Sequence, residues 1–140
     1  MRIFLDANIL FSASKSAGAV RELLGRATAA GHELCADVYV AAEARRNVAV
    51  KAPEGRDALE ALLANVEVTA HAATALPRDL SVRLHDKDRP VLAAAIRMRC
   101  DALVTGDRTH FGALYGATIR VVAIHSPRSI AEALGLSMTS

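Results

Sequence analysis

The chain has 140 residues, of which 52% are hydrophobic and 4% are aromatic, and its formal net charge is +2 at pH 7. This length suits a single core, so we expect residues 1–140 to form one domain. The apolar runs are far shorter than the roughly 20 residues that cross a bilayer, and we expect neither a membrane span nor a secretory signal. Cys35 and Cys100 lack a C-x-x-C spacing, which predicts buried free thiols in a soluble α/β protein of the cytoplasm.

Helix and strand patterns alternate along the chain. Short apolar runs that end in a polar residue predict buried parallel strands, and apolar residues three or four positions apart predict helices. In chain order, we predict a strand at residues 2–6, one or two helices within 9–30, a strand at 33–36, helices at 38–50 and 57–64, a strand at 66–68, a short helix and a loop within 69–84, a helix at 90–99, a strand at 102–105, a loop at 106–112, a strand at 119–124 and a helical turn introduced by Ser126. This alternation predicts β-α-β units, a parallel sheet of strand order 3-2-1-4-5 and a three-layer sandwich.

Acidic residues stand where predicted strands end and predicted helices begin. Asp6 and Asp107 each follow a strand, Asp88 precedes a helix, and Glu43 lies on a mostly apolar stripe of another helix. Ligands of open parallel sheets bind beyond the carboxyl ends of the strands. We therefore expect these four acids to meet at that edge of the sheet.

Four carboxylates that meet must be neutralised. At a separation of about 5 Å they repel by about 3 kcal/mol per pair, so they either take up protons or bind a cation. Oxygen ligands favour Mg²⁺ or Mn²⁺, and the chain has no Cys or His spacing typical of zinc and no calcium loop. Such an ion lowers the pKa of water and stabilises a leaving alkoxide, which predicts phosphodiester hydrolysis. The basic remainder of the chain suits a phosphate polymer.

Each acid also has a purely structural interpretation. Asp88 could cap the helix that follows it, and Asp107 could form a turn. Asp6 could accept hydrogen bonds from its own loop, and Glu43 could pair with Arg46. The four residues are therefore stronger evidence together than singly.

Four motifs carry a family resemblance. They are IFLDANIL at residues 3–10, EARRN at 43–47, DRPVLAAA at 88–95, and LVTGD at 103–107 with Phe111 after it. In this order they resemble the PIN-domain nucleases over nearly the whole chain. The resemblance implies a Rossmann-like three-layer α/β/α PIN fold with a central parallel sheet, and Mg²⁺- or Mn²⁺-dependent cleavage of RNA. Many bacterial and archaeal members are the toxin of a toxin–antitoxin pair.

The resemblance also assigns roles to the acids. By motif, Asp6, Asp88 and Asp107 would hold the metal, and Glu43 would hold it or orient the attacking water. Asp86 competes with Asp88 for its role, although the spacing to the following helix favours Asp88.

Neighbouring polar residues would assist these acids. Asn8 and Thr105 would orient carboxylates or water. His110 stands where many members have a further acid, which leaves the number of metal ions open. Basic residues beside the acids could contact RNA phosphates, or could instead dock an acidic antitoxin tail. The candidates for substrate contact are Arg46, Arg89, Arg108 and His110, and Arg45 and Lys87 also lie beside acids.

The leading prediction is an endoribonuclease in which water activated by the ion attacks phosphorus and leaves a 5′-phosphate. Its expected partners are RNA, an antitoxin protein and a second copy of the chain. Two alternatives stay open. An aspartyl-phosphate enzyme would use Asp6 as its phosphate acceptor, but Asn8 stands where haloacid-dehalogenase-like enzymes place a second acid. A non-catalytic module that binds RNA or protein would keep the fold without turnover.

Overall fold

The computed structural model describes residues 1–70 and 84–136. The helices and strands, in chain order, are β1 (Arg2–Leu5), α1 (Ala7–Lys15), α2 (Ala19–Ala29), β2 (Glu33–Asp37), α3 (Val38–Lys51), α4 (Arg56–Leu63), β3 (Glu67–Thr69), α5 (Arg89–Arg97), β4 (Ala102–Val104), α6 (Arg108–Phe111), β5 (Thr118–Ile119), β6 (Val122–His125) and α7 (Pro127–Ala133). Short 3₁₀ turns occupy Pro53–Gly55 and Gly112–Leu114. The helix and loop predicted within residues 69–84 lie almost wholly outside the described residues.

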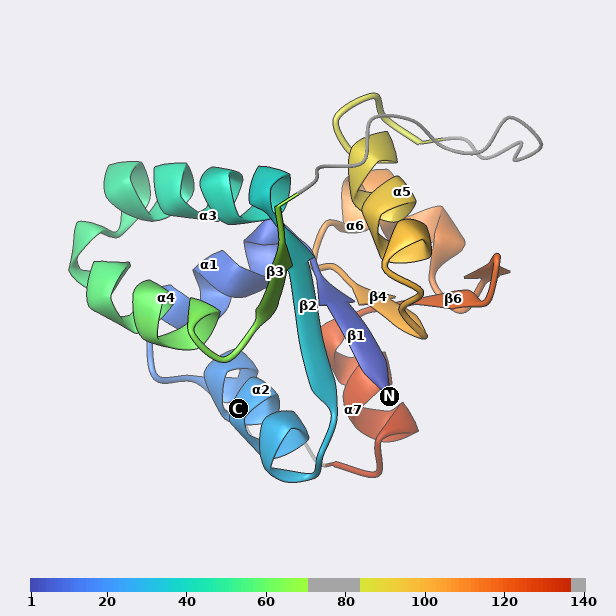
Figure 1. Ribbon diagram of the computed structural model, residues 1–140, viewed down its shortest axis with the longest axis horizontal. Helices are drawn as coiled ribbons and strands as arrows, with labels where there is room; N and C mark the ends of the chain where they lie inside the picture. Colours follow the sequence, from blue (N-terminus) through green and yellow to red (C-terminus); the bar gives the residue numbers. More distant parts are fainter. Residues whose placement is uncertain (71–83, 137–140) are drawn as a thin grey trace.

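The strands of the described residues form one six-stranded sheet in the order β3-β2-β1-β4-β6-β5 (Figure 1). β3, β2, β1, β4 and β6 pair in parallel, and β5 pairs antiparallel with β6. The predicted α/β/α class and the predicted strand order are confirmed, with β6 in the fifth position. In this order β1 and β4 are neighbours, so the residues that follow them meet at one edge.

Helices cover both faces of the sheet (Figure 1). On β1, Ile3 and Leu5 pack with apolar residues of α1, α2 and α7. Arg2 points to the opposite face, beside the end of α5, and strand alternation directs Phe4 to the same side. Because Phe4 and Leu5 are both fully buried, the first strand is an apolar run that ends at the polar Asp6.

The ends of several helices carry residue types that favour helix termini. Gly31, with φ of 91°, follows α2. The Asp37 carboxylate caps α3 by accepting a hydrogen bond of 2.9 Å from the Val40 amide, and Ser126 caps α7 through the Ser129 amide. These caps fix where each helix leaves the sheet.

Two predictions near the end of the described chain are wrong. The single strand predicted at residues 119–124 is a hairpin that turns at Arg120 and Val121, whose φ angles are 51° and 67°. Two successive positive φ values are typical of a type I′ turn, which usually contains Asn or Gly. The loop predicted at residues 106–112 contains α6, because the Asp107 carboxylate caps it by accepting from the His110 amide at 3.1 Å.

Both cysteines are free and buried, as predicted. Cys35 lies on β2, and Cys100 lies in the connection between α5 and β4. Within the described part of the chain, no helix combines the length and the apolar content needed to cross a membrane.

Candidate metal centre

Asp6 and Thr105 follow the paired strands β1 and β4 and lie side by side. The Thr105 hydroxyl donates to Oδ2 of Asp6 at 2.8 Å, and the Ala7 amide donates to Oδ1 at 2.8 Å. Asp6 therefore accepts a hydrogen bond from its own loop, as its structural interpretation predicted, but through only one of its two oxygens. Both carboxylate oxygens are held at the carboxyl edge of the sheet.

Asp6 is an acid in an unfavourable place for a charge. It is 4% exposed, and this burial raises the pKa of its carboxyl to about 6, against the lowering effect of the hydrogen bonds from Thr105 and Ala7. The negative charges of Asp88 and Glu43 raise the pKa further. At neutral pH a nearby cation would relieve this cost.

Asn8 ties the end of β1 to the loop after β4. Its Nδ2 lies 3.3 Å from both Asp6 Oδ2 and Thr105 Oγ1, and its Oδ1 accepts from the Gly106 amide at 2.8 Å. Thr105 Oγ1 also accepts from the Asp107 amide at 3.1 Å. These bonds fix the backbone that carries Asp107 relative to Asp6.

Asp88 precedes α5, but its side chain makes no capping hydrogen bond, so the interpretation of Asp88 as a helix cap is wrong. Asp88 is buried, at 8% exposed. Its Oδ2 lies 2.6 Å from His110 Nδ1, and Asp107 Oδ2 lies 2.8 Å from the same nitrogen. Within the described residues, neither Asp88 Oδ2 nor His110 Nδ1 has a hydrogen bond of acceptable geometry. Burial raises the pKa of Asp88, while the charge of His110 lowers it.

Glu43 and Asp107 complete the predicted set, which we call the acid cluster (Asp6, Glu43, Asp88 and Asp107). Glu43 lies on α3 and is partly exposed, and its charge acts on Asp6, while the charge of Asp107 acts on Asp88. No ion pair joins Glu43 to Arg46 among the described residues. The four acids are therefore linked electrostatically, although their oxygens do not all converge on one point.

A second set of donors does converge, and the sequence did not predict it. One donor atom each from His85, Asp88 and His110 lies within 4.8 Å of the other two. The rings of His85 and His110 are stacked, with centroids 4.6 Å apart and an interplanar angle of 10°. The only sequence signal for His85 is its position three residues before Asp88.

Asp86, the alternative to Asp88 as a metal ligand, has a different environment. Asp86 is exposed, whereas Asp88 is buried against His110. Lys87, between them, is exposed, and its carbonyl accepts from the Tyr39 hydroxyl at 3.1 Å. Of the two acids, Asp88 is the one whose charge acts on Asp6.

Two of the predicted basic residues lie near the acid cluster. Burial raises the pKa of Tyr39, the charge of Asp6 raises it further, and the charge of Arg46 lowers it. Burial and the charge of Asp6 likewise raise the pKa of Tyr115, and the charge of Arg108 lowers it. Each arginine therefore acts on a tyrosine on which Asp6 also acts. Arg46 and Arg108 are exposed. Arg45 instead forms two hydrogen bonds of 2.9 Å with Glu60, so the structure gives it a partner other than a phosphate.

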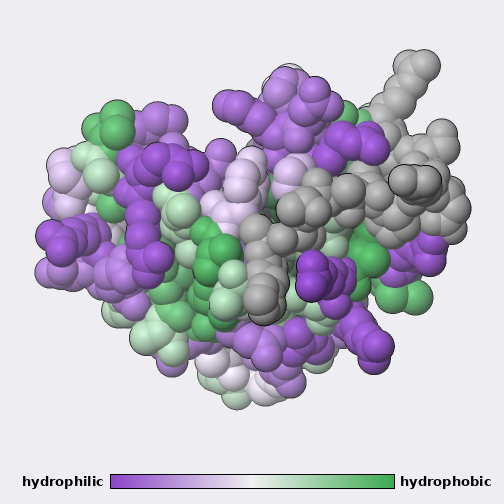
Figure 2. Space-filling model, turned by 45° about the horizontal axis from the view of Figure 1, so that its top comes forward, coloured by the Kyte–Doolittle hydropathy of each residue, from purple (hydrophilic) through white to green (hydrophobic). Residues whose placement is uncertain are grey.

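Hydrophilic side chains gather on the face that contains the ends of the strands. Figure 2 brings the top of Figure 1 forward and shows hydrophilic groups over α3 and over the start of α5. Arg89, in the first turn of α5, is partly exposed. Such a polar surface is compatible with a charged ligand.

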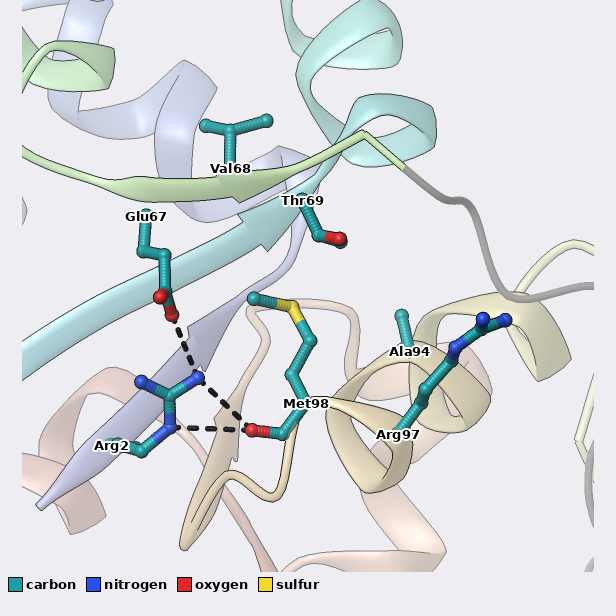
Figure 3. Close-up of a pocket in the computed structure, with 7 residues that line it drawn as sticks. All are labelled: Arg2, Glu67, Val68, Thr69, Ala94, Arg97 and Met98. Atoms are coloured by element: carbon teal, nitrogen blue, oxygen red, sulfur yellow. Dashed lines mark hydrogen bonds and ion pairs between the residues drawn. The ribbon is translucent and has the colours of Figure 1, made fainter.

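A cavity of about 380 Å³ lies away from the acid cluster, between β1, β3 and the end of α5 (Figure 3). Within it, Arg2 donates to Glu67 at 2.7 Å and to the Met98 carbonyl at 3.0 and 3.2 Å, and its other nitrogen donates to Glu33 at 2.6 Å. These bonds join the first strand, the third strand and the end of α5. We assign Arg2 a structural role.

Comparison with known proteins identifies the family. The family model described as PIN domain matches residues 2–109. A chain in the crystal structure of VapBC2 from Rickettsia felis, bound to a DNA fragment from its promoter, has a TM-score of 0.66 and 19% identity, over 90% of this chain and 98% of that chain. A chain of VapBC-1 from nontypeable Haemophilus influenzae has a TM-score of 0.56 and 14% identity, over 91% of this chain and 98% of that chain. No curated protein matches the chain. The match to the family model covers most of the sequence, and the chain belongs to the PIN domain family.

Proposed function

We propose that the chain is a metal-dependent endoribonuclease that hydrolyses RNA phosphodiester bonds with Mg²⁺ or Mn²⁺. The observation that carries the proposal is the acid cluster at the carboxyl edge of the sheet, in which Asp6 and Asp88 are buried and act on each other electrostatically. Oxygen donors in this number fit a hard divalent ion. Asp88 Oδ2 supports the fit, because it is a buried acceptor without a hydrogen bond among the described residues.

Each residue near the cluster has a role in this proposal. A bound ion would supply an acidified water and neutralise charge on the phosphate. Thr105 and Asn8 hold the Asp6 carboxylate in one orientation through hydrogen bonds of 2.8 and 3.3 Å. The residues that would hold the ion, or orient the water in the case of Glu43, are Asp6, Glu43, Asp88 and Asp107. The residues that would contact the phosphates of RNA are Arg46, Arg89 and Arg108, with His110 beside them.

The test compares acids that differ in burial. Asp6→Asn, Asp107→Asn and Asp88→Asn should each lower Mg²⁺-stimulated cleavage of an end-labelled RNA by about 100-fold or more, because the ion contributes several kcal/mol to such reactions. Asp86→Asn is the matched control, since Asp86 is exposed and two residues from Asp88, and it should cleave like the wild type. The products should carry 5′-phosphates. Full activity of Asp6→Asn and Asp88→Asn would contradict the proposal.

An antitoxin partner is part of the proposed function. Its support is the likeness in fold to chains of VapBC2 and VapBC-1. Expression of the wild type alone should stop growth, whereas Asp6→Asn should not, and the product of a small gene immediately upstream should copurify with the chain and restore growth. If wild type and Asp6→Asn affect growth equally, the toxin role is contradicted. We also predict a homodimer, and light scattering of the purified chain measures its mass.

The aspartyl-phosphate alternative has less support. Asp6 would have to attack a phosphoryl group, yet it is 4% exposed and each of its oxygens accepts a hydrogen bond. Labelling of the protein by acetyl phosphate would favour that alternative. RNA binding of equal affinity in EDTA and in Mg²⁺, without cleavage, would favour a non-catalytic module.

A further inference from the structure

Two imidazoles lie beside Asp88 of the acid cluster, and with it they form a mixed set of nitrogen and oxygen donors. We propose that His85, Asp88 and His110, called here the histidine site, bind a late first-row transition ion such as Co²⁺, Ni²⁺ or Zn²⁺. Binding at this site does not depend on the proposed nuclease function. Its consequence for RNA cleavage does, because Asp88 belongs to both sets.

The donor atoms of Asp88 and His110 are closely spaced. His110 Nδ1 lies 2.6 Å from Asp88 Oδ2 and 2.8 Å from Asp107 Oδ2. Ligands around a four- or five-coordinate ion with bonds of about 2.1 Å lie about 3 to 3.4 Å apart, so a small widening of these separations would admit one. Neither His110 Nδ1 nor Asp88 Oδ2 has a hydrogen bond of acceptable geometry within the described part of the chain, so the two explanations of the short distances are an ion pair with His110 and a shared cation.

The contacting atoms of Asp88 and His110 are buried. Asp88 is 8% exposed, and Asp88 Oδ2 and His110 Nδ1 are both shielded from solvent. A buried acceptor without a hydrogen bond carries a free-energy cost that a cation removes. An ion pair with His110 is the competing explanation, and measurements of metal binding separate the two.

Binding of one ion by both imidazoles requires one ring to turn. The stacked rings of His85 and His110 are nearly parallel, at 10°, so their lone pairs cannot meet at one ion until one ring turns. His85 is exposed, and its Nδ1 accepts only a long hydrogen bond of 3.2 Å from the Lys87 amide. The three donor atoms already lie within 4.8 Å of one another, and rotation of the exposed His85 side chain would direct its lone pair at a shared ion.

The ligand types determine which ions fit. Imidazole favours Zn²⁺, Co²⁺ and Ni²⁺, whereas Mg²⁺ favours oxygen ligands and keeps most of its water. Two imidazoles and one carboxylate make a typical ligand set for a transition ion. The histidine site should therefore take up such an ion in the presence of excess Mg²⁺.

The direct test is metal binding without RNA. Untagged wild type, stripped with EDTA, should develop the visible absorption band of four- or five-coordinate Co²⁺, and Zn²⁺ should displace it while excess Mg²⁺ should not. His85→Ala should weaken Co²⁺ and Zn²⁺ binding by at least about tenfold, as loss of a metal-site partner does. This side chain is exposed, so the variant should fold. His110→Gln, checked for folding by circular dichroism, should weaken binding as much.

The matched control is His32→Ala. His32 contacts the amino group of Met1 at 3.2 Å, outside the histidine site, so this variant should bind Co²⁺ like the wild type. The proposal is overturned if the wild type shows no such band, or if His85→Ala binds as tightly as the wild type. In that case His110 only forms an ion pair with the two aspartates.

A second measurement separates this inference from the proposed function. Zn²⁺ should inhibit Mg²⁺-dependent RNA cleavage by the wild type, because both ions need Asp88, and the inhibitory concentration should rise at least about tenfold in His85→Ala, in line with the lost affinity. Asp6→Asn should lose cleavage and keep the Co²⁺ band. A wild type that cleaves no RNA but shows the band would contradict the nuclease proposal alone.

Discussion

Asp6 shows how burial and function compete in one side chain. The pKa of this carboxyl is about 6 in the folded chain, against an ordinary value of 3.8. A raised pKa means that the fold prefers the protonated acid, so the favourable contribution is full below pH 4 and is lost as the pH rises through 6. We predict that Asp6→Asn stabilises the metal-free protein at pH 7 by about 1–3 kcal/mol, because about two pH units correspond to about 3 kcal/mol.

Urea unfolding in EDTA at pH 7 and pH 4 measures this effect. The carboxamide that Asp6→Asn introduces keeps an acceptor for the Ala7 amide, so the gain at pH 7 should vanish at pH 4, where the wild-type acid is also neutral. Asp86→Asn, at an exposed site, should change little at either pH. A destabilised Asp6→Asn at pH 7 would show that the hydrogen bonds from Thr105 and Ala7 outweigh the cost of burying the charge.

Single residues differ in how far the sequence predicts their positions. Asp6 and Asp107 were expected at one edge of the sheet because the strands before them were predicted to be neighbours. The structure places these strands side by side and joins Asp6 to Thr105, which follows β4, by a bond of 2.8 Å. The contact of His110 with Asp88 and Asp107 was not predicted, because His110 lies on α6, where a loop was expected. His85 was missed because its partner is 25 positions away and no local periodicity links them.

At the scale of elements, the hairpin between β5 and β6 contains a strained turn. Val121 is 76% exposed and has a φ of 67°, a conformation that β-branched residues adopt at a cost of about 1–2 kcal/mol. Val121→Gly relieves this strain, but Gly also has a greater conformational entropy in the unfolded chain, which offsets part of the gain. We predict a net stabilisation of about 1 kcal/mol. Thermal unfolding measures the change.

The matched control is the same substitution in a helix. Val50 is 79% exposed and lies near the end of α3, so Val50→Gly should destabilise the protein by a few tenths of a kcal/mol. If both substitutions destabilise, the positive φ at Val121 carries no strain.

The same turn explains which elements the sequence could predict. The strands with continuous apolar runs, β1, β2 and β4, were predicted within one residue, because burial on both faces leaves a clear pattern. Arg120 and Val121 lack the Asn or Gly of a type I′ turn, so nothing in the sequence marked the hairpin. α6 has only four residues and depends on one cap from Asp107, which propensity alone cannot reveal.

At the scale of the whole molecule, the acid cluster joins segments from both halves of the chain. Its members come from the end of β1, from α3, from the start of α5 and from the loop after β4. The native fold alone holds these acids near one another, so an ion that binds them binds the folded state and not the unfolded chain. Stability and metal occupancy are then linked.

We therefore predict that Mg²⁺ raises the melting temperature of the wild type, with a gain of about 2.7 kcal/mol at 100 times its dissociation constant. Asp88→Asn removes a buried donor of the cluster and should lose most of this dependence, whereas Asp86→Asn should keep it. Scanning calorimetry over a series of Mg²⁺ concentrations, with NaCl added to constant ionic strength, measures the effect without RNA. An equal rise in Asp88→Asn, or an equal rise produced by NaCl alone, would mean that Mg²⁺ only screens surface charge and that the cluster is not a metal site.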